Sequence, residues 1–180
     1  MQKVLFTGQG GQGVLSMGLM LSESAMHAGK NVTFLPSYGV EMRGGPASCG
    51  VTITDGELAS PLCTSPDILI CMSERALLEH KHQVKQGGMI LVNSSIVQNI
   101  PEEKNIYKVP ANDLAIEAGN IKASNMVMLG FLVALTSIVD EQAIYICLKE
   151  KFGEKEKVRL VNEKAFLLGK NLCLKLQGKA

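Results

Sequence analysis

The stretch FTGQGGQGVLSMG, residues 6–18, decides the fold of this chain. It begins at the end of an apolar run and leads into a segment in which Leu15, Leu19 and Met26 recur at helical spacing. Four glycines lie between the two parts, and Gly29 follows the apolar repeat. This order predicts a buried strand, a tight glycine turn and a helix that ends at Gly29. The first N–H groups of a helix after such a turn favour an anion or a polar partner.

Strand and helix patterns alternate along the chain up to about residue 120 and then give way to helices alone. The later predicted strands are residues 31–36, 49–54, 65–73, 89–95 and 106–110, of which 49–54 allows a mixed sheet. The predicted helices after the first are residues 74–86, 112–118, 125–139, 141–152 and 154–177. Asn112 and Asp140 are candidate helix caps, and Gly119 is a candidate stop.

These patterns predict an α/β fold for the whole chain. We expect a single domain, residues 1–180, with a three-layer doubly wound architecture. Its sheet is mostly parallel, with helices on both faces and a helical C-terminal segment.

The composition argues against two classes of partner. A net charge of +1 without a dense basic stripe is unlike a nucleic-acid-binding surface, which needs many cationic contacts to phosphate. The most apolar run, residues 126–139, is shorter than the ~20 residues of a membrane helix, and the first eight residues resemble a strand rather than a signal peptide. We therefore expect a cytoplasmic protein that binds neither nucleic acid nor membrane.

The cysteines and histidines give no metal-binding pattern. The five cysteines include no C-x-x-C pair, so the spacing typical of zinc and iron–sulfur sites is absent from the sequence. His80 and His82 are two residues apart on a predicted helix and point to different faces. We expect no metal site on this chain.

The spacing of Gly8, Gly10 and Gly13 also fits a dinucleotide-binding turn. Such a site needs an acidic residue at the end of the next strand to bind the ribose hydroxyls. Pro36 and Ser37 stand at that point instead. An independent NAD- or NADP-dependent dehydrogenase therefore stays an alternative that the sequence disfavours.

A second glycine-rich loop, SYGVEMRGGPAS at residues 37–48, follows the second predicted strand. Arg43 there offers a planar guanidinium that can grip phosphate or carboxylate, and Gly44 and Gly45 allow unusual backbone dihedrals. Loops after strands of a doubly wound sheet lie near the glycine turn. The alternative is a solvated loop in which Arg43 pairs with Glu41.

The order of these motifs resembles one known family along nearly the whole chain. The segments GQGGQG (8–13), SYGVEMRGGPAS (37–48), SPDILICMS (65–73), GGMILVNSS (87–95) and NMVMLG (125–130) are similar to the gamma subunit of 2-oxoacid:ferredoxin oxidoreductases, the pyruvate/ketoisovalerate oxidoreductase catalytic domain family. The resemblance implies a multi-subunit enzyme that oxidatively decarboxylates a 2-oxoacid and transfers the acyl group to coenzyme A. Thiamine diphosphate, Mg²⁺ and [4Fe-4S] clusters would be held by alpha, beta and ferredoxin-like delta chains, with ferredoxin as electron acceptor.

The resemblance also implies a functional face on this chain. We expect that face to border the assembled active site, toward coenzyme A or a partner backbone, while the chain alone is inactive. Its residues are Gly8, Gly10, Gly11, Gln12, Gly13, Glu41, Arg43, Gly44, Gly45 and, with capping as its alternative role, Asn125.

No residue has the surroundings of an activated nucleophile, because Ser73 and Ser94 at strand ends are more typical of caps and turns. A further alternative is a non-catalytic interaction module. It is motivated by two apolar faces, which consist of Val14, Gly18, Leu21 and Ala25 in the first helix and Val158, Val161, Ala165, Leu168 and Leu172 in the last. In either case the isolated chain is expected to be able to self-associate through its partner surface. Pyruvate, 2-oxoglutarate and branched-chain oxoacids all remain open as substrates.

Overall fold

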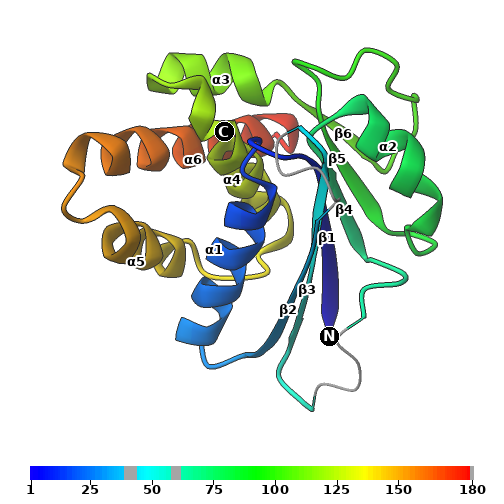
Figure 1. The fold of residues 1–180 in the computed structure, drawn as a ribbon, viewed down its shortest axis with the longest axis horizontal. Coiled ribbons are helices and arrows are strands. Elements are labelled where there is room, and N and C mark those ends of the chain that lie inside the picture. Colours follow the sequence, from blue (N-terminus) through cyan, green and yellow to red (C-terminus); the bar gives the residue numbers. More distant parts are fainter. Residues whose placement is uncertain (39–43, 58–61, 179–180) are drawn as a thin grey trace.

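The structure, a computed structural model, describes residues 1–38, 44–57 and 62–178. A six-stranded sheet in the order β2-β3-β1-β4-β5-β6 forms its centre (Figure 1). The strands are β1 (Gln2–Gln9), β2 (Asn31–Tyr38), β3 (Pro46–Thr54), β4 (Ile68–Cys71), β5 (Met89–Asn93) and β6 (Ile106–Val109). The helices are α1 (Val14–His27), α2 (Glu74–His80), α3 (Ala111–Ala118), α4 (Ser124–Thr136), α5 (Glu141–Phe152) and α6 (Glu156–Leu176), with short 3-10 helices at Lys81–Gln83 and Ile121–Ala123.

The sheet is mixed, and a single strand runs against the rest. β1, β4, β5 and β6 pair in parallel, whereas β3 is antiparallel both to β1 and to β2. β2 and β3 form a hairpin whose connection is too short for a parallel crossover. β2 consequently points the same way as β1, and the expectation of a mostly parallel sheet is confirmed.

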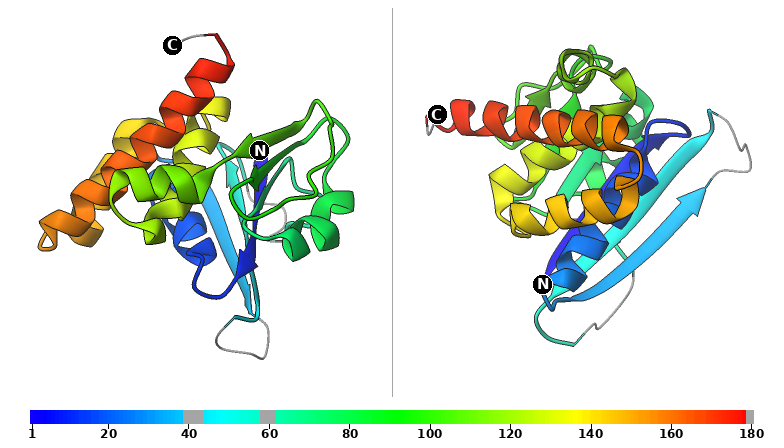
Figure 2. Two further views of the ribbon diagram at one scale, coloured as in Figure 1. Left: turned by 90° about the horizontal axis from the view of Figure 1, so that it is seen from above. Right: turned by 90° about the vertical axis from the view of Figure 1, so that its left-hand side faces the viewer.

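Helices cover both faces of the sheet unequally. Figures 1 and 2 show α1, α4, α5 and α6 on one face and the shorter α2 on the other. Alternation along β1 serves both layers, because Val4 and Phe6 join the larger core while Leu5 joins the smaller core beside α2. The three-layer arrangement therefore follows from a β1 that is apolar on both faces.

α4 and α6 cross at two glycines that bring their backbones together. A Cβ atom on Gly130 of α4 would lie 2.0 Å from the carbonyl oxygen of Phe166 on α6. A Cβ atom on Gly169 of α6 would lie 2.0 Å from the carbonyl oxygen of Val127 on α4. Neither position has room for any other residue, so the two helices meet main chain to main chain.

The apolar faces of the first and last helices are largely used inside the molecule. Val14, Leu21 and Ala25 of α1 are buried against the sheet. On α6, Ala165 is fully buried, and Val161, Leu168 and Leu172 pack against the same core. These faces therefore do not motivate a separate interaction module. Among the described residues, no helix is both long enough and apolar enough to cross a membrane.

The predicted boundaries of several elements differ from the structure by a few residues, and two of the differences are informative. The helix expected over residues 74–86 ends at His80, and a 3-10 turn at Lys81–Gln83 follows it. The hairpin strands are longer than expected, because Tyr38 still pairs with Ala47 across the hairpin. Cross-strand pairing thus extends strands into a segment that its composition marks as loop.

The caps were predicted with mixed success. Asp140 caps α5 by accepting a hydrogen bond from the Gln142 N–H at 2.8 Å, and Gly119 ends α3 with φ of 119°. Asn112 was a wrong prediction, because α3 begins one residue earlier. The Asn112 side-chain oxygen accepts a hydrogen bond from Asn93 Nδ2 at 3.0 Å instead.

Candidate functional site at the glycine turn

The turn between β1 and α1 needs glycine for two different reasons. Gly11 and Gly13 have φ of 95° and 73°, in the region that residues with a Cβ atom avoid. Gly8 instead has no room, since a Cβ atom there would lie 2.8 Å from both Met72 and Val14 side chains. The glycine spacing in the sequence therefore encodes a tight turn pressed against the end of β4.

The Gln12 side chain holds this turn in place. Its Oε1 accepts a hydrogen bond from the Gln9 N–H at 2.8 Å, and its Nε2 donates to the Met72 carbonyl oxygen at 2.9 Å. One amide thus closes the turn and ties it to the residue after β4. The sequence shows Gln12 as a polar residue in a glycine motif, but only the fold shows that Met72 is its acceptor.

Asn125 lies directly beneath the start of α1. A Cβ atom on Gly13 would lie 2.5 Å from Asn125 Nδ2, and that nitrogen donates to the Gly13 carbonyl oxygen at 3.4 Å. Asn125 Oδ1 accepts from the Met126 N–H at 3.0 Å. Asn125 is buried, so it acts here as a polar support under the turn.

The structure brings the two loops of the sequence motif together. β1 and β3 pair so that Gly8 faces Ala47 and Gln9 faces Pro46. Beyond this register, the Gly10 N–H donates to the Gly45 carbonyl oxygen at 2.9 Å. Gly44, with φ of 76°, comes immediately before. Glu41 and Arg43 were predicted in the same loop, but they lie outside the described residues.

Two hollows flank this junction. One of about 330 Å³ lies over the turn and is lined by Gln9, Gly10, Gly11, Gly13, Val14, Leu15, Ser16 and Ala47. Among the described residues, no side chain caps the N-terminus of α1 there, so its first N–H groups and their partial positive charge face the hollow. The other, of about 260 Å³, lies on the α2 side, between Gly8, Ser48, Ser73, Arg75 and His80 among others.

Three thiols and the Ser73 hydroxyl are not activated for nucleophilic attack. Burial raises the pKa of the Cys49 and Cys71 thiols to about 12 and that of Cys63 to about 11. Ser73 caps α2 by accepting from the Ala76 N–H at 3.3 Å, as its position after a strand predicted. The site can therefore bind and position groups, but these residues offer no nucleophile.

The sheet order also weakens the dinucleotide alternative. In a dinucleotide-binding fold, the strand that carries the ribose-binding acid lies next to the strand before the glycine turn. Here β3 lies between β1 and β2, so the end of β2 is two strand spacings, about 10 Å, away from β1. Pro36 and Ser37 at that end offer no carboxylate.

Comparison with known sequences agrees with this arrangement. The sequence model of the family described as "Pyruvate ferredoxin/flavodoxin oxidoreductase" matches residues 3–172. The 2-oxoglutarate synthase subunit KorC of Methanocaldococcus jannaschii is 33% identical over 178 residues, which cover 95% of each chain. The ketoisovalerate oxidoreductase subunit VorA of Methanothermobacter thermautotrophicus is 38% identical over 157 residues. Those residues are 87% of this chain but 33% of VorA, so the chain spans about a third of that relative.

Solved structures share the fold. The gamma subunit of a keto/oxoacid ferredoxin oxidoreductase from Geobacter sulfurreducens is 30% identical with a TM-score of 0.80, covering 97% of this chain and 99% of its own. A 2-oxoglutarate:ferredoxin oxidoreductase from Magnetococcus marinus, solved with 2-oxoglutarate, coenzyme A and succinyl-CoA, has a TM-score of 0.89 at 27% identity. The match covers 99% of this chain and 32% of the Magnetococcus marinus chain. With its glycine turn, its paired second loop and these matches, the chain belongs to the pyruvate ferredoxin/flavodoxin oxidoreductase family.

Proposed function

We propose that the chain acts as a single gamma-type domain, the gamma subunit of a multi-subunit 2-oxoacid:ferredoxin oxidoreductase. The complex converts a 2-oxoacid and coenzyme A to acyl-CoA and CO₂ and passes the released electron pair to ferredoxin. The observation that carries the proposal is the hydrogen bond from the Gly10 N–H to the Gly45 carbonyl oxygen. It joins the two loops whose sequences point to the family, just beyond the C-terminal end of β1.

The face that this bond creates is proposed to border the assembled active site. Gly8, Gly11 and Gly13 carry no side chains, so a ligand can approach the backbone of the turn closely. The N-terminus of α1 is then accessible to an anion. Gln12 and Asn125 hold the turn rigid from below. Glu41 and Arg43 precede Gly44 and Gly45 in the chain and are proposed to belong to the same face. Arg43 is proposed to grip a phosphate of coenzyme A or a partner carboxylate.

The remaining machinery is proposed to come from companion chains. Alpha and beta chains would hold thiamine diphosphate and Mg²⁺, and a ferredoxin-like delta chain would hold the [4Fe-4S] clusters. The five cysteines of this chain lack cluster spacing.

On α6, Leu160 and Leu167 are exposed and lie seven residues apart on one face, which gives a companion chain an apolar surface. The five cysteines, all of them described residues, form no disulfide with one another, which supports the proposed cytoplasmic, reducing environment for the complex.

The first experiment separates a subunit from an independent enzyme. The purified chain is assayed with 2-oxoacid, coenzyme A and a viologen acceptor, alone and after reconstitution with its companion chains. We expect turnover only in the reconstituted complex. Turnover by the chain alone, or a micromolar 1:1 isotherm with NADH or NADPH in titration calorimetry, would reject the proposal.

The second experiment tests the proposed face. Arg43→Lys and Arg43→Ala are compared in the reconstituted complex with Arg159→Lys, a control on α6 whose guanidinium pairs with Glu163. We expect both Arg43 variants to assemble normally, with a raised KM for coenzyme A that is largest for Arg43→Ala, because one ammonium cannot reproduce the guanidinium fork. Kinetics equal to those of the Arg159→Lys complex would remove Arg43 from the active-site border.

A further inference from the structure

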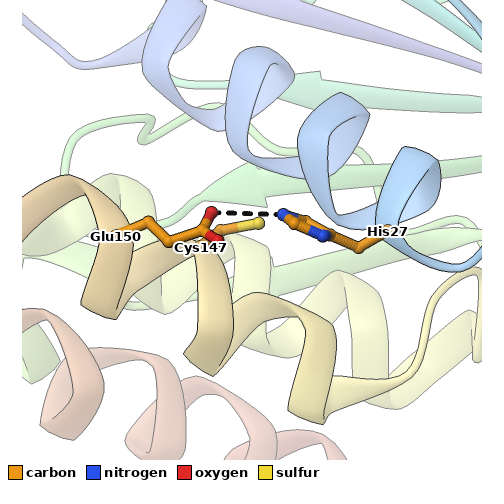
Figure 3. A group of neighbouring side chains, drawn as sticks. All are labelled: His27, Cys147 and Glu150. Carbon is orange, nitrogen blue, oxygen red and sulfur yellow. Dashed lines mark hydrogen bonds and ion pairs between the residues drawn. The ribbon is translucent and has the colours of Figure 1, made fainter.

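Three side chains of metal-binding type meet where α1 packs against α5, at the end of α1 opposite the glycine turn (Figure 3). His27 is the last residue of α1, and Cys147 and Glu150 lie three residues apart on α5. One ligand atom from each lies within 4.8 Å of the other two. Within residues 1–38, 44–57 and 62–178, no other three His, Cys, Asp or Glu side chains converge in this way.

We propose that His27, Cys147 and Glu150 bind one Zn²⁺ ion. Imidazole nitrogen, thiolate sulfur and carboxylate oxygen are the ligands that zinc takes, and three protein ligands with one water complete a tetrahedral site. Ligand atoms at zinc distances of 2.0–2.3 Å lie about 3.5 Å apart in a tetrahedron. The His27 Nε2 to Glu150 Oε2 distance is 3.1 Å. Side-chain shifts on the order of 1 Å would therefore form the site.

The charges around the sulfur suit a cation. A thiolate and a carboxylate together neutralise a divalent ion, with His27 as a neutral ligand. The carboxylates of Glu23 and Glu150 also act on the sulfur electrostatically, and a bound divalent ion offsets their negative charge.

Ser24 is placed as a supporting residue for the thiolate. Its Oγ lies 3.3 Å from Cys147 Sγ and 2.8 Å from the Met20 carbonyl oxygen. The single hydroxyl proton can turn from the carbonyl to the sulfur once the thiol loses its proton. Such a hydrogen bond orients a ligand and stabilises its charge.

An ordinary ion pair explains only part of this group. His27 and Glu150 have side chains that are 42% and 60% exposed, and exposed ion pairs contribute little to stability. That explanation gives no reason for the buried Cys147 sulfur beside them. The exposure of the other two ligands gives the ion a path from solvent. A bound ion would fasten the end of α1 to α5, two elements that are far apart in the chain.

Cobalt spectroscopy of the full chain tests the proposal. The reduced, chelator-treated protein is titrated with Co²⁺ and then with Zn²⁺. We expect one equivalent of Co²⁺ to give visible ligand-field bands and a near-ultraviolet thiolate-to-cobalt band, both removed by Zn²⁺. Absence of the thiolate band from the wild-type chain would overturn the site.

Variants assign the ligands. We expect Cys147→Ala to lose the thiolate band and His27→Gln to bind at least tenfold more weakly, whereas the matched controls Cys63→Ala and His82→Ala bind as wild type. Zn²⁺ should raise the melting temperature of the wild type and not that of His27→Gln, a surface variant that retains the core even if Cys147→Ala fails to fold. A thiolate band that persists in Cys147→Ala, or an unchanged zinc response in His27→Gln, would count against the proposal.

Discussion

The glycine turn and the α4–α6 crossing use the same residue for opposite purposes. In the turn, Gly11 and Gly13 are needed for their positive φ, and no other part of the described chain occupies the space where a Gly11 side chain would be. At the crossing, Gly130 and Gly169 have ordinary helical backbone but no space at all. The first region therefore depends on backbone freedom and faces a hollow, while the second depends on close packing and faces a neighbouring helix.

This difference teaches where substitutions should affect stability and where they should affect function. A side chain at the crossing must push two main chains apart, which the core resists. A side chain at Gly11 only strains its own backbone. Substitutions ranked by this distinction test whether the two regions are as different as the geometry indicates.

The largest loss is expected for Gly169→Ala. Its Cβ atom would lie 2.0 Å from the Val127 carbonyl oxygen, and a main-chain carbonyl cannot rotate away as a side chain can. We expect the free energy of unfolding to fall by about 3 kcal/mol. Denaturant unfolding measures it, with Gly56→Ala as control because the nearest atom to its Cβ is 3.9 Å away. Equal stability of the two variants would show that the helices can separate without cost.

Gly13→Ala should come next, because it combines both effects. The positive φ and the 2.5 Å approach to Asn125 Nδ2 together should lower the free energy of unfolding by about 2 kcal/mol. Adding Asn125→Ala removes the neighbouring side chain and leaves the backbone strain. A double-mutant cycle should then show favourable coupling of roughly 1 kcal/mol. Strict additivity would mean that Asn125 does not restrict this position.

A smaller effect is expected for the Gln12 amide. Gln12→Ala removes the hydrogen bonds to the Gln9 N–H and the Met72 carbonyl oxygen. We expect a loss of about 1–2 kcal/mol, because solvent can replace part of what is lost. Gln9→Ala, in the same turn but with an exposed side chain, is the control. Equal melting temperatures of the two variants would show that the Gln12 side chain does not stabilise the turn.

Gly11→Ala should have the smallest effect on stability. No atom of the described residues lies within 4 Å of its Cβ position, so the backbone strain at φ of 95° is the expected cost, about 1 kcal/mol. Because the new methyl group projects toward the hollow over the turn, the assembled enzyme should lose more activity than this stability loss explains. Unfolding and steady-state kinetics on the same variant separate the two quantities, and unchanged kinetics would place the active-site border elsewhere.

Local sequence signals were sufficient for the turn and much of the fold. The strand, glycine turn and helix at residues 2–27 follow from periodicity and glycine spacing, and Asp140 and Gly119 act as their residue types predict. The meeting of the two loops was also expected, since strand ends gather at one edge of a doubly wound sheet.

The remaining features depend on contacts between distant parts of the chain. In the sequence alone, Gly130 and Gly169 are residues that destabilise a helix. Only the α4–α6 crossing shows that no side chain fits at these two positions. The Gln12 acceptor, Met72, follows a strand that only the sheet order places beside the turn. His27 and Glu150 are 123 residues apart, and no local spacing links them. A single sequence does not carry such pairings.

The position of β3 has a consequence for how the chain is made. β1 is synthesised before both of its sheet neighbours, β3 and β4, and it is apolar on both faces. While the ribosome adds the intervening residues, this strand has unpaired edges on two sides and nothing of its own sheet to cover them. β1 can therefore complete its pairing on both sides only after the chain has been synthesised to about residue 71.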